Sequence, residues 1–167
     1  MTATWSPQHI STLLTTAFAP LVAKTPSTSA PPANIDVLIT FDRQGVSAHP
    51  NHISLYHGAR QFLSSIMKRH AGWECPIALY TLTSTSVLRK YLSVLDAPLT
   101  LLQLFTLRKK QLEPPSPLMF ASGFGEYREA QKAMIEGHRS QMKWFRWGWV
   151  GASRYMVIND LMLEKII

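Results

Sequence analysis

The sequence predicts an α/β fold, a Rossmann-like and mostly parallel sheet with flanking helices. A short, β-branched apolar run at residues 35–41 is typical of a buried strand, and a second such run lies at residues 76–82. Between them, apolar residues recur with helical spacing over residues 50–66. A strand, a helix and a strand in this order predict a βαβ unit with parallel pairing.

The length and charge of the chain narrow the classes of protein to which it can belong. A chain of 167 residues is long enough for one domain with a sizeable core. Its net charge of +7 favours an anionic partner, such as a phosphoinositide head group, a membrane surface or nucleic acid. Cys75 is the only cysteine, which excludes an internal disulfide and a cysteine-rich zinc site. Neither a transmembrane helix nor a signal peptide is predicted.

The N-terminal residues predict a helix and then a loop. Ser6-Pro7 is typical of a helix start, and apolar residues at helical spacing predict a surface helix that covers a sheet; they are Ile10, Leu13, Leu14, Phe18 and Leu21. Residues 24–34 are rich in Thr, Ser, Pro and Ala, which predicts a loop or linker. We expect it to be an insertion within a single domain of residues 1–167.

Polar residues follow the first predicted strand, at the position where α/β sheets place their binding sites. Asp42 comes directly after the strand, a loop with Gly45 follows, and His49 and His52 stand at the start of the predicted helix. The helical spacing directs both imidazoles into one crevice, whereas His57 faces solvent. Asp42 either orients an imidazole or closes an Asx turn that holds the loop.

The two histidines are candidates for metal chemistry. A neutral imidazole can bind zinc, and His52 is the best candidate for a metal ligand, although the residues alone favour a structural or capping role. His49 can donate a hydrogen bond or a proton near the same metal. The alternative for His49 is to cap backbone groups at the entry of the helix.

The C-terminal half predicts shorter elements. A short helix over residues 87–95 ends at Asp96-Ala97-Pro98, and the apolar residues 99–107 fit a strand, a core segment or a membrane-facing segment. Residues 108–117 predict an exposed turn. The remaining predictions are a short edge strand at residues 118–122, a long helix at residues 126–145 and a last strand at residues 153–158.

Two further features of this half bear on function. Three tryptophans and Phe145 lie between residues 144 and 149 beside Lys143 and Arg146, a pattern found in membrane-interface belts, in packed cores and on nucleic-acid surfaces. We expect mixed use, in packing and at an interface. His138 falls on the inward face of its predicted helix, where it is either a core histidine or a residue that approaches the site.

Residues 40–52, Thr-Phe-Asp-Arg-Gln-Gly-Val-Ser-Ala-His-Pro-Asn-His, closely resemble the second signature of the N-acetylglucosaminylphosphatidylinositol de-N-acetylases, which belong to the zinc-dependent PIG-L/LmbE-like deacetylases. The resemblance resumes, in the family's order, at residues 80–84, 90–92, 138–146 and 153–156. The family's first signature, a strand followed by His-Pro-Asp-Asp-Glu, is not found. The resemblance therefore implies the C-terminal part of such a domain, with a sheet that is incomplete on its N-terminal side.

This resemblance implies hydrolysis of the N-acetyl group of N-acetylglucosaminyl-phosphatidylinositol by a zinc-activated water, in the biosynthesis of glycosylphosphatidylinositol (GPI) anchors. The implied location is the cytoplasmic face of the endoplasmic reticulum membrane, with the membrane surface as a partner and no nucleic acid. His52 becomes a zinc ligand, His49 and Asp42 become candidate catalytic residues, and further candidate substrate contacts are Arg43, Asn51 and His138.

The other zinc ligands of the family belong to the signature that is not found. We therefore expect this chain alone to be weakly active or inactive. The alternative hypothesis is a non-catalytic glycolipid-binding or regulatory remnant of the family.

Overall fold

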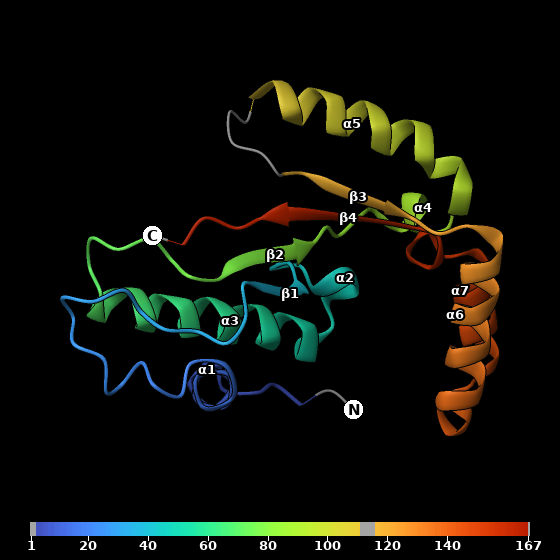
Figure 1. Ribbon diagram of the computed structural model, residues 1–167. Helices are drawn as coiled ribbons and strands as arrows, with labels where there is room; N and C mark the ends of the chain where they lie inside the picture. Colours follow the sequence, from blue (N-terminus) through green and yellow to red (C-terminus); the bar gives the residue numbers. More distant parts are fainter. Residues whose placement is uncertain (1–2, 111–115, 167) are drawn as a thin grey trace. The chain divides into compact units, whose positions relative to one another are not determined.

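The computed structural model describes residues 3–110 and 116–166, without the side chains of residues 108–110. Residues 111–115 of the predicted turn at residues 108–117 therefore lie outside the described residues, whereas residues 108–110 are helical. The chain divides into two compact units, the first made of Met1–Ser84 with Met162–Ile167 and the second of Thr85–Leu161 (Figure 1). We call them unit 1 and unit 2.

Unit 1 contains the predicted βαβ arrangement. Strand β1 (Val37–Phe41) leads through helix α3 (Pro50–Arg69) to strand β2 (Ala78–Leu82). The two strands pair in parallel along their whole length. The α/β class and its Rossmann-like parallel unit are thus confirmed.

The core of unit 1 forms around one face of α3. Burying each large apolar side chain stabilises the fold by about 1.5–3 kcal/mol, so this face carries much of the unit's stability. His57 is exposed, as the helical spacing predicts. The buried cluster comprises Ala19, Val22, Ala59, Phe62, Leu63, Ile66, Ile77 and Leu79.

Helix α1 (Pro7–Phe18) packs on α3, and the prediction that it covers a sheet is wrong. Gly58 makes this packing possible, because a Cβ added there would lie 2.4 Å from Cγ2 of Ile10. Because Gly58 has no side chain, α1 and α3 can approach closely. Leu13 and Leu21 remain exposed, and the helix ends at Phe18.

The predicted linker at residues 24–34 is a loop that folds against unit 1. The buried His70 places Nδ1 3.0 Å from the carbonyl oxygen of Ser29. The backbone N–H of Asn34 donates to the carbonyl oxygen of Phe18 at 2.8 Å. These contacts hold the loop on the unit that contains it.

Strand β1 is less buried than its composition predicts. Leu38 packs against the core, but Val37 and Ile39 are 48% and 59% exposed. Successive side chains of a strand point to opposite faces, so one face of β1 is apolar and uncovered. Within the described residues, β1 pairs along one edge only.

Unit 2 begins with helical segments and contains an antiparallel strand pair. Strand β3 (Leu118–Ala121) pairs with strand β4 (Ile158–Leu163), which confirms the short edge strand. The end of β4 belongs to unit 1, where the N–H of Glu164 donates to the carbonyl oxygen of Leu79 at 2.8 Å. The helical segments are α4 (Val87–Lys90), η1 (Ser93–Asp96), α5 (Ala97–Lys110), α6 (Phe124–Gly137), η2 (Arg139–Gln141), α7 (Trp144–Ala152) and η3 (Arg154–Met156).

Three predictions for this half need correction. For residues 99–107 the strand alternative is wrong: they belong to α5, because Pro98 occupies the first turn of a new helix, where proline is tolerated. The long helix predicted at residues 126–145 is two helices, since α6 ends at Gly137. The strand predicted at residues 153–158 starts only at Ile158, because Ser153 caps the turn η3 by accepting from the N–H of Tyr155.

A buried ion-pair network holds unit 2 together. The fully buried Arg154 lies with Nε 2.9 Å from Oδ2 of Asp96, and its Nη2 donates to Oδ1 of Asp160 at 2.9 Å. Arg89 donates to Oδ1 of Asp96 at 2.7 Å, and Thr100 donates to Oδ2 at 2.8 Å. Each buried charge therefore has partners of opposite charge. Across the described residues, no helix is long and apolar enough to cross a membrane.

Candidate active site

Asp42 ties together the ends of the two parallel strands of unit 1. Its Oδ1 accepts from the N–H groups of Gln44 and Gly45, each at 3.0 Å, which closes the predicted Asx turn. Ser84, just beyond β2, donates its hydroxyl to the same oxygen at 2.6 Å and its N–H to Oδ2 at 2.7 Å. Four donors thus engage this carboxylate, and its main structural effect is to hold the loop after β1.

The loop held in this way has an unusual backbone. Helix α2 (Gly45–Ala48) is a single distorted turn in which Gly45, Val46 and Ala48 have φ values of 61°, 63° and 54°. Positive φ is costly for a β-branched residue such as Val46. Its N–H donates to Oγ of Ser84 at 2.8 Å, and this bond helps to offset the strain. Gly45 supplies the backbone conformation for which the sequence predicted a glycine.

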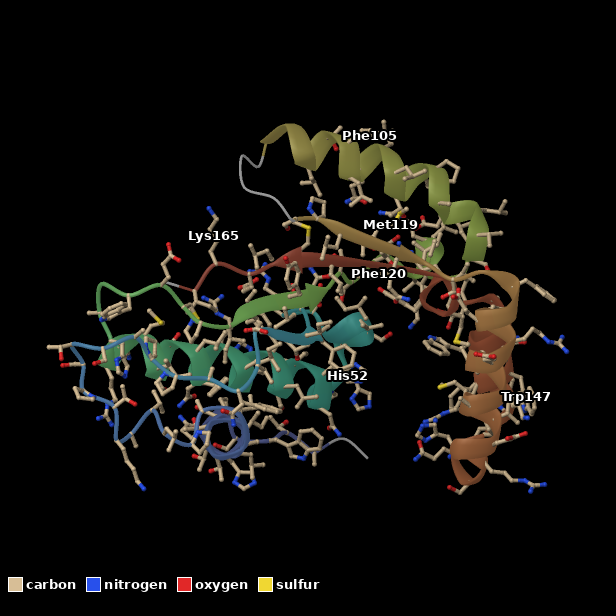
Figure 2. The ribbon with its side chains drawn as sticks, in the orientation of Figure 1. His52, Phe105, Met119, Phe120, Trp147 and Lys165 are labelled. Atoms are coloured by element: carbon tan, nitrogen blue, oxygen red, sulfur yellow. The ribbon has the colours of Figure 1, made fainter. Side chains whose placement is uncertain are left out.

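His52 lies flat against Phe41 at the start of α3 (Figure 2), with ring centroids 3.7 Å apart and planes inclined by 9°. Its Nδ1 is 3.1 Å from the carbonyl oxygen of Gly45. Since a carbonyl only accepts, Nδ1 carries the proton and Nε2 keeps its lone pair. Burial and the nearby His49 lower the pKa of His52 from 6.5, although the bond to Gly45 opposes this shift. The neutral, metal-binding form is therefore favoured at neutral pH.

His49 lies beside His52, with ring centroids 4.8 Å apart and planes inclined by 31°. The two imidazoles therefore lie next to each other, which agrees with the predicted spacing. His49 is the N-cap residue of α3, yet its side chain makes no capping hydrogen bond. Its Nδ1 and Oδ1 of Asn51 are buried without a hydrogen-bond partner among the described atoms. Such orphaned polar atoms are costly and point to a ligand that satisfies them.

Two other candidate residues occupy exposed positions. Arg43 is exposed in the loop after β1. His138 is exposed at the C-cap of α6 in unit 2, so the expectation of a core histidine is wrong. The helix ends one residue before His138, and its side chain therefore no longer follows the inward face.

The residues present do not by themselves complete a catalytic zinc centre. Such a centre has three protein ligands. His52 offers one nitrogen lone pair, but the described part of the chain contains no group of three His, Cys, Asp or Glu side chains able to hold a metal. The donor set fits one ligand of a zinc site and falls short of the whole.

Sequence reasoning missed Phe41 and Ser84 as parts of the site. Both stand at the carboxyl ends of neighbouring parallel strands, which is the position where α/β folds place functional residues. Their position at the ends of these strands was the signal that could have identified them as site residues. Their contacts with His52 and Asp42 join segments far apart along the chain, and local spacing does not predict them.

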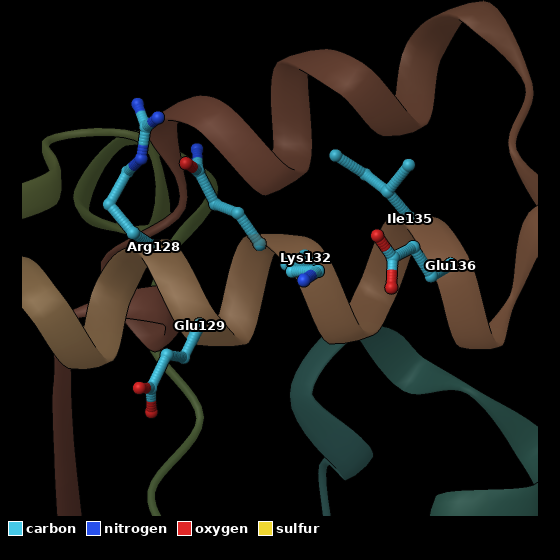
Figure 3. A pocket seen from close by; sticks show the side chains of 6 residues that line it. Arg128, Glu129, Lys132, Ile135 and Glu136 are labelled. Carbon is cyan, nitrogen blue, oxygen red and sulfur yellow. The ribbon is translucent and has the colours of Figure 1, made fainter.

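A hollow in unit 2 lies apart from these residues. It has a volume of about 510 Å³ and lies along α6 (Figure 3). The side chains that line it include positively and negatively charged ones, and none of the predicted site residues is among them. The lining residues are Arg128, Glu129, Gln131, Lys132, Ile135 and Glu136.

Comparison with known proteins identifies the family. No protein-family model matches the chain, and no solved structure matches it. The chain is 47% identical to the N-acetylglucosaminyl-phosphatidylinositol de-N-acetylase of Arthroderma benhamiae. This alignment covers 99% of the chain and 57% of the relative. The chain is 38% identical to the protein of that name from Bos taurus, over 76% of this chain and 44% of the relative.

A probable de-N-acetylase of the same name from Schizosaccharomyces pombe is 36% identical over 77% of this chain and 46% of the relative. The chain thus spans about half the length of the curated relatives it matches. Because the alignment with the Arthroderma protein covers nearly the whole chain, it includes the loop after β1, His49 and His52. The chain belongs to the N-acetylglucosaminyl-phosphatidylinositol de-N-acetylase family.

Proposed function

We propose that this chain supplies part of the active site of an enzyme that hydrolyses the N-acetyl group of N-acetylglucosaminyl-phosphatidylinositol in GPI-anchor biosynthesis. The names of the relatives support this substrate. The observation that carries the proposal is the pair of imidazoles, in which His52 keeps Nε2 unprotonated and His49 has a buried Nδ1 without a partner.

Amide hydrolysis sets two tasks that suit His49. Negative charge grows on the carbonyl oxygen, and the leaving amine then needs a proton. An imidazole nitrogen without a protein partner is free to donate to either atom. General acid catalysis of this kind contributes about 10²–10⁴-fold to a rate.

Asp42 has a positioning role in this proposal. Its carboxylate holds the N–H of Gly45, and the carbonyl oxygen of Gly45 fixes the imidazole of His52. A substitution of Asp42 therefore acts on His52 through the loop. The geometry supports this role over direct participation in proton transfer, because four donors already engage the carboxylate.

Zinc bound in such a site supplies a water whose pKa is lowered to about 7. We propose that Nε2 of His52 is the ligand that this chain contributes, and that the remaining ligands come from residues outside this chain. The absence of a three-ligand group among the described residues supports this division. It follows that the chain alone is weakly active or inactive.

The substrate carries a phosphate and sugar hydroxyls, for which the chain offers several candidate contacts. The exposed guanidinium of Arg43 suits the phosphate, and the orphaned Oδ1 of Asn51 suits a hydroxyl donor. We keep His138 as a further candidate. The site of action is the membrane surface at the cytoplasmic face of the endoplasmic reticulum, and the exposed Trp144 and Trp147 of α7 are suited to such an interface.

The test is to measure zinc content and deacetylation with the chain alone, and then with the part of the Arthroderma benhamiae relative that the alignment does not cover. We expect less than stoichiometric zinc and weak turnover from the chain alone, and a gain of both on addition of the missing part. His52→Ala abolishes the gain of zinc, whereas His49→Ala keeps zinc and lowers turnover at least about 100-fold. Stoichiometric zinc with robust turnover from the chain alone contradicts the divided site.

A second candidate is a non-catalytic protein that binds the glycolipid head group. The incomplete ligand set among the described residues favours it. Binding of N-acetylglucosaminyl-phosphatidylinositol by the chain, with no turnover under either condition above, supports this candidate over the enzyme.

A further inference from the structure

Helix α5 of unit 2 is apolar on more sides than it buries. Its inward side presents Thr100 and Leu104, which are 2% and 9% exposed. Leu99, Leu102 and Phe105, spaced by three residues, are 48%, 64% and 67% exposed. The side chain of Phe105 projects from the side of α5 that faces away from β3 (Figure 2). One broad side of this helix is therefore apolar and uncovered.

The segments that precede α5 expose further apolar side chains. Val87 and Leu88 in α4 are 75% and 76% exposed, and Leu95 in η1 is 72% exposed. Tyr91 and Val94 between them are also exposed. Many exposed apolar side chains on successive segments of a folded protein favour a site of protein or membrane interaction.

The charges around this surface favour an anionic bilayer over a protein. Residues 85–110 contain a single acidic residue, Asp96, and it is fully buried between Arg89 and Arg154. The sequence Arg-Lys-Lys at residues 108–110 directly follows the apolar part of α5. Apolar residues beside clustered basic residues, with no exposed carboxylate, are typical of helices that lie in the interface of a membrane with anionic lipids.

We propose that α4, η1 and α5 form a docking face that lies on the surface of a bilayer containing anionic phospholipid, with Leu102 and Phe105 entering the acyl region. The face lies along the membrane, since no helix of the described residues is able to cross it. The biological purpose of this docking rests on the proposed function, because the substrate there is itself an anionic membrane lipid.

Vesicle binding by the whole chain tests this proposal. Co-sedimentation is measured with vesicles of phosphatidylcholine alone and with vesicles that also contain phosphatidylinositol. We expect binding to the mixed vesicles that weakens as salt is raised. The double variant Leu102→Gln/Phe105→Gln should lower the partition coefficient at least about tenfold, because two apolar side chains no longer leave water.

Two matched variants serve as controls. Leu13→Gln alters an exposed leucine of helix α1 in unit 1 and should leave vesicle binding unchanged. Trp144→Gln/Trp147→Gln removes the exposed tryptophans of α7, so a loss of binding in this variant alone assigns the contact to α7 and overturns the proposal. Circular dichroism and thermal unfolding show that each variant keeps its fold.

Other outcomes also overturn the proposed face. One is that the wild-type chain ignores both kinds of vesicle. Another is that the chain forms a dimer without lipid, and that Leu102→Gln/Phe105→Gln abolishes this dimer, which makes the face an interface between copies. The vesicles contain no N-acetylglucosamine and the buffer no zinc. Failure of deacetylation therefore leaves the docking result intact, and failure of docking leaves the deacetylase proposal intact.

Discussion

The imidazole of His52 lies against the phenyl ring of Phe41 with ring centroids 3.7 Å apart. This contact covers one face of the imidazole, while the carbonyl oxygen of Gly45 holds its Nδ1. Phe41 ends β1 and His52 lies in the first turn of α3, so the strand and the helix together position the ring. The site is therefore built into the βαβ unit at the carboxyl end of its first strand.

The titration of His52 is the first testable consequence. Burial and the nearby His49 lower its pKa from 6.5, against the effect of the bond to Gly45. We expect NMR titration to give a pKa below 6.5. His49→Asn should raise it by removing a like charge, and Phe41→Ala should raise it by admitting water. A pKa that stays unchanged in both variants contradicts this account.

The same shift predicts how stability depends on pH. The unfolded chain binds a proton at His52 more readily than the folded chain does. The neutral imidazole of His52 therefore makes its full contribution to the free energy of unfolding above about pH 6.5. This contribution is lost as pH falls through the lower folded pKa. Urea unfolding at several pH values should show a shallower dependence in His52→Gln than in the wild type across this window.

The bridge between Asp42 and Ser84 predicts a large effect from a small substitution. Ser84→Ala leaves the N–H of Val46 without its partner and removes one of the three donors to Oδ1 of Asp42, and should lower the free energy of unfolding by about 1–3 kcal/mol. Ser65→Ala is the matched control, because Ser65 is exposed and bonds only within its own helix. Equal losses in chemical denaturation for both variants rule out a special role for the bridge.

The close contact of α1 and α3 predicts that Gly58→Ala destabilises unit 1. The added Cβ would lie 2.4 Å from Cγ2 of Ile10, and overpacking of this kind costs about 1–3 kcal/mol. Gly148→Ala in helix α7 meets nothing within 4 Å and should be neutral or stabilising, by up to about 1 kcal/mol. Thermal unfolding compares the two variants, and a neutral Gly58→Ala requires a different packing of α1.

The buried ion-pair network of unit 2 predicts a strong dependence on Asp96. Burial alone would raise the pKa of Asp96, but hydrogen bonds from Arg89 and Thr100 and the charge of Arg154 lower it below 3.8. Asp96→Asn removes the carboxylate that pairs with Arg89 and one of the two carboxylates that face the buried Arg154, and should cost about 3–5 kcal/mol at neutral pH.

Acid separates this effect from a loss of packing. The stabilisation by Asp96 is present above about pH 3.8 and is lost as pH falls through its lower folded pKa. The difference in stability between the wild type and Asp96→Asn should therefore shrink in strong acid. Glu136→Gln, at an exposed position on α6, should show no difference at any pH. A constant difference for Asp96→Asn down to strong acid contradicts the ion-pair account.

The parts of the fold set by local chemistry were predictable, and those set by tertiary contacts were not. The spacing of His49 and His52 at a helix start predicted that their rings lie close together, because both rings depend on the same turn. The approach of Ile10 to Gly58 was not predictable, since a glycine within a helix gives no sign of what will pack on it. Residues 99–107 left a strand, a core segment and a membrane-facing segment open, because apolar residues on nearly every side carry no period.

The hydrogen bond from His52 ends on a main-chain oxygen, that of Gly45, and this choice has an evolutionary consequence. The residue type at the acceptor position matters as well, because φ of Gly45 is 61° and an added Cβ would lie 2.9 Å from Cγ1 of Ile53. Insertions or deletions between the strand and the helix would move the oxygen away from His52. We therefore expect natural variants of this protein to keep both Gly45 and the length of this loop, and NMR titration of His52 in a library of loop variants would reveal this dependence.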